Sequence, residues 1–347
     1  MWLLPTPATR TTHVVRSLKG GNNSAKIFTN LEQLGLQIML SSMSLRPVAL
    51  CILLAFYALN AIASPVDPRA ADDLVHTPGG MLPKSNVHTV PEGGKIVHSA
   101  TEVRLLDANG AVLHAAPLKG AKPRFNLPND PAIKPSLTSR NLQAATIAAI
   151  AQAPSVSSFL SDWGLPPLPQ VNSGQLLMYF AALAPPTVDA LIQPTLQYGV
   201  SAAGGGPFWS IASWFITEDQ AFVTNLTQLS PGSLTLDSFV VNEDQFLGTP
   251  GTHAWFTGFQ SFPAAGLNIQ TVEDFNVAIV ALEITNAITL GNLPNTPTDI
   301  EEIFILETNG QSFSPIPWSF SSDTADGITI NKLPRPFNGD ETLFFQY

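Results

Sequence analysis

The fold class is decided by the stretch Val277-Ala278-Ile279-Val280-Ala281-Leu282-Glu283-Ile284-Thr285. Alternate residues of a strand point to opposite faces, and here both faces are apolar beside the glutamate. A strand that is apolar on both faces is buried on both. The stretch therefore predicts a strand inside a β-sheet whose two faces are covered, with one carboxylate, Glu283, built into it.

Other strand-like stretches surround this one and recur about every ten residues, a spacing typical of antiparallel sandwiches and barrels. Turns rich in proline and glycine separate them, such as Pro231-Gly232 and Pro250-Gly251. We predict an all-β fold, a sandwich of two antiparallel sheets over residues 151–347. The Ala- and Ile-rich stretch 141–152 can form one helix before it. The expected strands beside 277–285 are 174–182, 195–199, 209–217, 233–241, 253–262 and 302–308.

The N-terminal part of the chain carries an export signal. Met43-Ser44-Leu45-Arg46 precedes an apolar run, which the A-x-A pattern Ala61-Ile62-Ala63 follows. We assign residues 1–64 to an upstream extension plus a signal peptide, with the real start at Met43 or, alternatively, Met39, and expect a secreted protein. The alternative is a signal anchor in which residues 47–63 remain as a single membrane span.

Residues 65–150 are predicted to be a basic pro-segment or linker that is poorly ordered. Residues 65–140 hold nine Lys or Arg and seven Asp or Glu, whereas residues 141–347 hold two and eighteen, a net charge of −16. One hairpin is indicated over 102–114, because Asn109-Gly110 separates two apolar runs.

The negative charge of residues 141–347 disfavours nucleic acid and anionic membranes as partners. We expect a monomer with no stable membrane contact after signal removal. The single cysteine, Cys51, precedes the predicted cleavage site, so the mature chain has no disulfide. Asn225-Leu226-Thr227 is a sequon that export would make available for glycosylation at Asn225.

The acidic part offers few kinds of catalytic chemistry. It holds one histidine, His253, no G-x-S-x-G elbow for a serine triad, and no run of His, Cys and carboxylates with metal-ligand spacing. A phosphate loop and a dinucleotide fingerprint are also missing from the sequence. We therefore expect no metal and no cofactor, and carboxylate and amide chemistry remains.

Glu283 is the first candidate, because a buried carboxylate is costly unless it is paired or protonated. No Lys or Arg lies between Arg140 and Lys332, so only Lys332, Arg335 or a retained pro-segment could pair with it. Desolvation would then raise the pKa of Glu283, which suits a general acid or base at low pH. The alternative is a strand-end glutamate that turns to solvent or is held by backbone donors.

Gln197 is the second candidate and lies in Gln193-Pro194-Thr195-Leu196-Gln197-Tyr198-Gly199. In a strand, Gln193, Thr195 and Gln197 share one face and apolar side chains share the other. On its own this pattern favours an ordinary amide on a polar surface, so the assignment of Gln197 needs further support.

Five motifs, taken in order, resemble those of the eqolisins, the fungal glutamic peptidases. Residues 195–199 are similar to the family's I-L-Q-x-G around its catalytic glutamine, and 281–284 to the A-E-W strand with its catalytic glutamate. The family's N-W-A-G segment and cysteines are missing, and Ile216 stands where the family has a glutamate. The other three motifs are 159–169, 212–215 and 230–234, similar to the strand ending in a V-P-x-P type turn, the A-W-Y segment and the start of the E-G-D strand.

This resemblance implies a concanavalin A-like sandwich with a substrate groove on the concave face of one sheet. It implies an acid-acting endopeptidase in which Glu283 is general base to a water and then general acid to the leaving amine. Gln197 would orient that water and donate to the oxyanion. Polypeptide substrates and the chain's own pro-segment would be the partners. The groove residues would be Trp209, Trp214, Thr195 and Gln193. The two tryptophans have opposite parity, so one can pack in the core while the other lines the groove, and the alternative is that both lie in the core.

Two other classes stay open. A lectin-like carbohydrate-binding sandwich shares this architecture, and a non-catalytic cell-surface protein needs no site. Gln197 and Glu283 within one water of each other would favour the peptidase. Scattered carboxylates beside a calcium site would favour the lectin, and Glu283 pointing to solvent would favour the non-catalytic protein.

Overall fold

The computed structural model describes residues 73–118, 144–230, 232, 235–244, 250–321, 327–333 and 341–347. They form mostly strands and loops, with the 3-10 helices η1 (Lys84–Asn86) and η2 (Leu290–Asn292) among the exceptions, so the predicted all-β fold is confirmed. Residues 1–64, with the predicted signal peptide and the alternative anchor 47–63, lie outside the described residues. Within the described part of the chain, no helix is both long and apolar enough to span a membrane.

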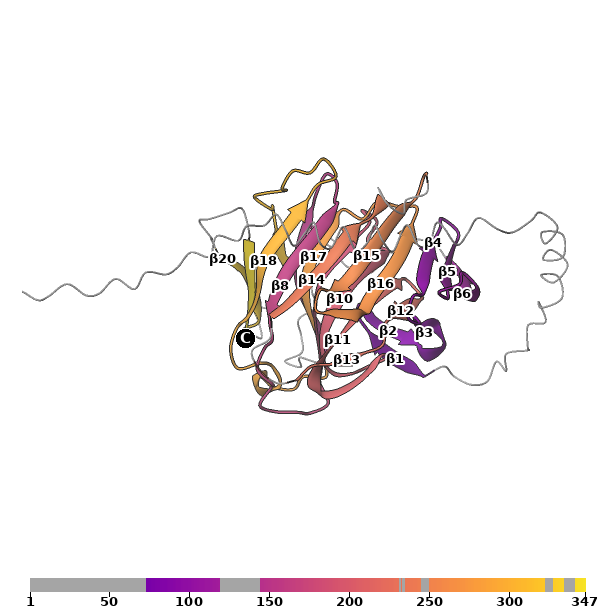
Figure 1. The fold of residues 1–347 in the computed structure, drawn as a ribbon. Coiled ribbons are helices and arrows are strands. Elements are labelled where there is room, and N and C mark those ends of the chain that lie inside the picture. The colour runs from indigo at the N-terminus through magenta and orange to yellow at the C-terminus, as the bar shows by residue number, and fades with distance from the viewer. Residues whose placement is uncertain are drawn as a thin grey trace, which may run out of the picture. The chain divides into compact units, whose positions relative to one another are not determined.

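The strands pair into two large sheets of nine and ten strands (Figure 1). The order of the first sheet is β19 (Ser319–Ser321), β7 (Ala144–Gln152), β17 (Val277–Thr285), β9 (Leu176–Ala184), β10 (Ala190–Ser201), β11 (Gly204–Thr217), β12 (Ala221–Val223) and β3 (Val87–Thr89), with β13 (Thr227–Gln228) paired to β11. The order of the second sheet is β20 (Thr329–Leu333), β21 (Glu341–Gln346), β18 (Thr298–Leu306), β8 (Ser158–Gly164), β14 (Thr235–Asn242), β15 (His253–Phe259), β16 (Phe262–Thr271), β4 (Lys95–His98), β5 (Glu102–Leu106) and β6 (Val112–Pro117). A separate hairpin joins β1 (Leu74–Thr77) to β2 (Gly80–Pro83).

One large apolar core lies between the two sheets, as expected for a sandwich. Leu196 of β10, Ile211 of β11 and Trp163 of β8 belong to one buried cluster, so both sheets contribute to it. The hydroxyls of Tyr179 on β9 and Tyr347 after β21 are hydrogen-bonded across this core. Burial of this much apolar surface is the main force that holds the sheets together.

A smaller apolar cluster covers the opposite face of the first sheet. It combines Leu82 of the β1–β2 hairpin with Trp214 and Ala212 of β11 and with side chains of β12. The register of β10 and β11 places Trp214 directly opposite Gln193, on the face turned away from Leu196. The β1–β2 hairpin therefore packs on the outer face of the first sheet.

Residues 73–118, which we call the upstream segment, are built into the same two sheets. β3 pairs with β12 and β4 pairs with β16, and these two pairs are the parallel ones among the described strands. This part of the predicted pro-segment therefore forms six strands, so the prediction of poor order is wrong for it. The hairpin predicted over 102–114 is confirmed as β5–β6. The division into a pro-segment, 65–150, and an acidic domain, 151–347, stays a prediction.

The helix expected over 141–152 is wrong, because its described part is strand β7. β7 lies between β17 and β19 and pairs with β17 along its whole length. Alanine favours helices in isolation, but a segment that is apolar on both faces fits a sheet covered on both sides. Tertiary pairing therefore overrides local propensity at β7, whereas the strand predicted over 277–285 coincides with β17.

Candidate active site

Gln197 and Glu283 lie on the same face of the first sheet. Gln197 is directly opposite Met178 of β9, and Met178 is directly opposite Glu283 of β17. Directly paired residues of antiparallel strands point to the same face, and two strand spacings place their Cα atoms about 10 Å apart. The face is the outer one, under the β1–β2 hairpin, so the fold brings the two predicted residues together on one surface.

The carboxylate of Glu283 is bound by the upstream segment. The backbone N–H of Gly79 donates to both oxygens of Glu283, at 2.9 and 2.8 Å. Glu283 is half-buried in a strand whose neighbouring residues are buried. Of the partners that the sequence suggested, Lys332 pairs with Glu341, and Arg335 lies outside the described residues. The raised pKa expected for Glu283 stays a prediction.

The turn between β1 and β2 explains why the Gly79 N–H is available. Thr77 is paired with Gly80, so Pro78 and Gly79 are the two central residues of a tight turn. Gly79 has φ +78°, and proline followed by a residue with this φ is typical of a type II turn. Pro78 has no N–H, and the i to i+3 hydrogen bond of such a turn does not use the N–H of Gly79, which is free to donate to Glu283.

The amide of Gln197 is fully buried and held by the β10–β11 turn. Its Nε2 donates to the carbonyls of Gly199 and Gly204, at 2.9 Å each, and its Oε1 accepts from Ser201 Oγ at 2.7 Å. Both amide hydrogens are therefore in use. Among the described residues no hydrogen bond joins Gln197 to Glu283.

The upstream segment also contacts the turn that holds Gln197. The N–H of Ala202 donates to the carbonyl of His76 on β1, at 2.8 Å. Ala202 and Ala203 pack against the same apolar cluster as Leu82. One hairpin of the upstream segment thus binds Glu283 through its turn and the Gln197 turn through its first strand.

The two tryptophans lie on opposite faces of β11. Trp209 packs in the core between the sheets, with its ring centroid 5.8 Å from Tyr179 and 5.4 Å from Tyr198. Trp214 lies in the smaller cluster, on the face that carries Gln197. Of the pair, Trp214 is therefore the one placed beside the candidate site.

Gln193 and Thr195 are fully buried on the same face as Gln197. Gln193 Nε2 donates to Thr195 Oγ1 at 3.2 Å. Gln193 Oε1 and Trp214 Nε1 are buried without a hydrogen-bond partner in the described part of the chain. Buried polar atoms ordinarily have a hydrogen-bond partner. Here an acceptor, Gln193 Oε1, and a donor, Trp214 Nε1, lack one on directly opposed residues, and Trp214 shares its cluster with Leu82.

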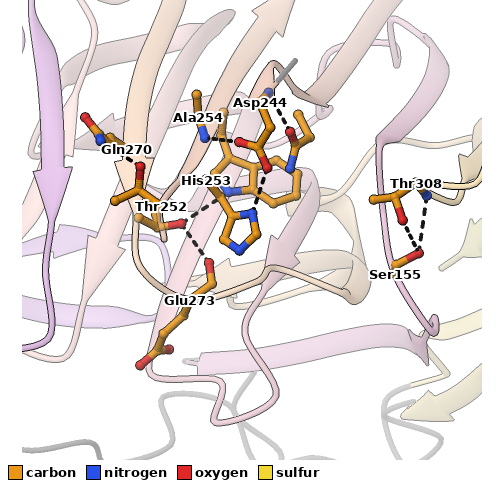
Figure 2. A network of polar contacts seen from close by, with 11 residues as sticks. Ser155, Asp244, Thr252, His253, Ala254, Gln270, Glu273 and Thr308 are labelled. Atoms are coloured by element: carbon orange, nitrogen blue, oxygen red, sulfur yellow. Dashed lines mark hydrogen bonds and ion pairs between the residues drawn. The ribbon is translucent and has the colours of Figure 1, made fainter. Parts of the chain in front are cut away.

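His253 is paired, but not with a nucleophile. Its Nδ1 lies 2.8 Å from Asp244 Oδ2, and Asp244 Oδ1 accepts from the N–H of Ala254, as Figure 2 shows. The serine drawn in the same figure, Ser155, bonds to Thr308 instead. The Asp244–His253 pair therefore holds the start of β15, and no hydroxyl of the described ranges completes a triad with it.

Several carboxylates of the second sheet have a raised pKa. Burial, together with the charges of Asp237 and Glu302, raises the pKa of Asp162 on β8 to about 6. Asp162 also lines a cavity of about 290 Å³ between β8 and the start of β18, and neither Gln197 nor Glu283 lines it. No group of three or more His, Cys, Asp or Glu in the described ranges could hold a metal ion.

The sequence did not predict the residues that hydrogen-bond the side chains of Glu283 and Gln197. Gly79 and Ser201 bind the two candidates directly, yet a glycine in a turn and a serine at the end of a strand carry no distinctive pattern. Asn225, the predicted glycosylation site, is exposed in the loop between β12 and β13.

No protein-family model matches the chain, and no curated protein matches it in sequence. Three of the solved structures that are similar in fold cover 59% of this chain and 98% of their own. Two are crystal structures of scytalido-glutamic peptidase, one with a peptide-based transition state analog (9% identity, TM-score 0.39) and one with a transition state analog inhibitor (8%, 0.37). The third is SCP-B, a member of the eqolisin family of peptidases, with the tripeptide Ala-Ile-His (9%, 0.35). The structural neighbours of this chain are thus eqolisin structures.

Proposed function

We propose that the chain is a secreted, acid-acting glutamic endopeptidase that uses Glu283 and Gln197 and is made in a latent form. One observation carries this proposal: a peptide N–H, that of Gly79, lies within hydrogen-bond distance of both oxygens of Glu283. The outer face of the first sheet therefore already receives a polypeptide backbone, with the half-buried Glu283 against the amide nitrogen.

The proposed reaction is hydrolysis of a peptide bond by an activated water. Glu283 accepts a proton from the water while the water oxygen attacks the carbonyl carbon of the substrate. The Nε2–H of Gln197 donates to the oxyanion that forms. Glu283 then passes the proton to the leaving nitrogen as the C–N bond breaks. The products are a carboxylic acid and an amine, and no cofactor enters this scheme.

Latency follows from the contacts of both residues. Glu283 is occupied by Gly79, and Gln197 has both amide hydrogens committed to Gly199 and Gly204. Donation to an oxyanion requires one of these bonds to open. Because Ala202 in the same turn is bound to His76, departure of the β1–β2 hairpin would remove Gly79 from Glu283 and one contact from the turn that holds Gln197.

A substrate strand has further donors and acceptors on this face. Gln193 Oε1 can accept from a substrate N–H, and Trp214 Nε1 can donate to a substrate C=O, once Leu82 leaves the cluster. Trp209 lies in the core and is not part of this proposed groove. Export, glycosylation at Asn225 and a monomeric state belong to the same proposal and rest on the sequence.

The test is proteolysis of a denatured protein substrate by the full-length chain from about pH 7 to pH 3, with wild type compared with Glu283→Gln. Activity should be confined to acid, and Glu283→Gln should lower kcat/KM by about a hundredfold to ten-thousandfold, the usual range for a general acid–base. Glu243→Gln is the matched control, because Glu243 is also partly buried but follows β14 of the second sheet.

The proposal fails if acid-treated wild type, with its upstream segment shown by hydrogen exchange to have left, cleaves no substrate. It also fails if Glu283→Gln and Glu243→Gln are equally active. A glycan-binding screen would then be the next measurement.

A further inference from the structure

Two histidines of the upstream segment are stacked where that segment joins the sandwich. The ring centroids of His88 and His114, which we call the histidine pair, are 3.6 Å apart with planes at 29°. Their Nε2 atoms lie 3.1 and 3.3 Å from one atom, Oε1 of Gln220. An amide oxygen only accepts, so each ring presents an Nε2–H to it.

The histidine pair connects the two sheets at their upstream ends. His88 is on β3, at the end of the first sheet, and His114 is on β6, at the end of the second. Gln220 lies in the turn between β11 and β12, where its N–H is bound by Thr217. Phe222 of β12 contacts both rings, at 5.3 and 6.2 Å between centroids. The upstream segment and the acidic part therefore meet at this pair.

A positive charge on His88 is unfavourable. Burial lowers the pKa of His88, and the positive charge that His114 can carry lowers it further, while the hydrogen bond to Gln220 acts in the opposite direction. The surrounding elements carry charges of both signs, and the pKa of His88 is lowered with these charges in place. They are Glu218 and Asp219 in the turn with Gln220, Lys84 of η1, and Glu102 and Arg104 of β5, which pair with each other at 2.9 Å.

The second parallel attachment has a similar feature. His98 of β4 is buried, and its Nδ1 has no hydrogen-bond partner in the described residues. Its ring meets Phe215 of β11 edge-on at 5.4 Å. Burial lowers the pKa of His98, and Asp189 acts in the opposite direction. Both strands that join the upstream segment to the sandwich, β3 and β4, thus hold a histidine in a site that resists protonation.

We propose that the histidine pair and Gln220 form an acid-sensitive attachment that holds the upstream segment, and with it the hairpin over Glu283, at neutral pH and releases it in acid. Protonation of both rings places two positive charges on rings that are in contact, around a single shared acceptor. η1 is the one connection between β2 and β3, so loss of β3 removes the nearest attachment of the hairpin. The consequence for activity rests on the proposed function, whereas the release itself does not.

Hydrogen exchange of the full chain, corrected for the intrinsic effect of pH, tests the release. Between about pH 7 and pH 4 the amides of β3 and β6 should lose protection, while those of β9 and β17 keep it. The transition should lie below the ordinary histidine pKa of about 6.5. The Glu283→Gln chain is measured in parallel, since no self-cleavage can occur in it under the proposed mechanism.

Two variants make the test specific. His114→Phe keeps an aromatic ring against His88 and removes one charge, and Gln220→Glu keeps the acceptor and adds a negative charge beside both rings. Each should move the transition to lower pH, by about one unit or more for Gln220→Glu. An opposite charge at this distance raises the histidine pKa in the docked state, so protonation of the docked rings opposes docking less. His253→Gln, on the second sheet, should leave the transition in place.

Protection of β3 and β6 that persists to about pH 4 in wild type would overturn the inference. So would a transition that neither His114→Phe nor Gln220→Glu moves. Release in acid without any peptidase activity would support the inference of an acid-sensitive attachment and would contradict only the proposed function.

Discussion

The upstream segment and the acidic part share the same sheets but differ in the groups that titrate. Residues 73–118 hold four of the six histidines of the chain, whereas residues 144–347 hold one histidine and eighteen Asp or Glu. In the upstream segment, burial lowers the pKa of His88 and His98. In the acidic part, burial raises the pKa of Asp162, Glu243 and Asp274. The difference teaches that a fall in pH acts on the two regions in opposite directions.

The direction follows from linkage. A histidine whose pKa is lowered on docking binds fewer protons in the docked state, so docking weakens as pH falls through about 6.5 and below. A carboxylate whose pKa is raised on folding binds more protons in the folded state, so stability increases as pH falls. For Asp162 this gain is acquired between about pH 6 and its ordinary value near 3.8. Acid should therefore loosen the upstream segment and strengthen the sandwich.

Leu82→Ala should have the largest effect on the difference between the two regions, because it should detach the hairpin of the upstream segment without acid. Leu82 is 5% exposed and belongs to the same buried cluster as Trp214 and Ala212. Loss of a buried leucine side chain costs about 2–5 kcal/mol. We expect the hairpin to leave the first sheet already at neutral pH, which would make Trp214 accessible to a fluorescence quencher. Quenching that matches wild type at about pH 7 would show that the hairpin does not depend on this contact.

Gly79→Ala should have a smaller effect on the same hairpin. Gly79 has φ +78°, and an L-residue there costs about 1–2 kcal/mol. We expect earlier release of the hairpin on acidification, measured by exchange of the β1 and β2 amides. Gly110→Ala is the matched control, because Gly110 has φ +83° in the β5–β6 turn with no atom within 4 Å of the added Cβ. Equal shifts of β1 and β2 in both variants would refute a specific role for Gly79.

Asp162→Asn should have the smallest effect of the three substitutions, and it tests the response of the acidic part to pH. The substitution removes a charge that is costly to keep beside Asp237 and Glu302. We expect a gain of up to about 1 kcal/mol at neutral pH, after allowance for solvent screening, and little change in acid. Thermal unfolding at about pH 7 and pH 4 measures it. A variant that gains equally at both pH values would contradict the assigned cause.

Local patterns were sufficient for much of the fold. The strand predicted over 277–285 has the bounds of β17, and the Asn109-Gly110 turn joins β5 to β6. The parity of Trp209 and Trp214 predicted that they lie on opposite faces of one strand, and both are buried, Trp209 in the core between the sheets and Trp214 in the smaller cluster. These features depend on the period of a strand and on turn chemistry, which neighbouring residues in the sequence determine.

Contacts between distant parts of the chain were decided by the tertiary structure alone. Gly79 meets Glu283 across 204 positions, and the histidine pair meets Gln220 across more than a hundred. β7 became a strand because β17 and β19 flank it, although its alanines favour a helix. The sequence by itself determined which faces are apolar and where the negative charge lies, because side-chain chemistry and local period settle both. Which backbone N–H reaches a given carboxylate depends on how the sheets assemble, and no local pattern encodes that.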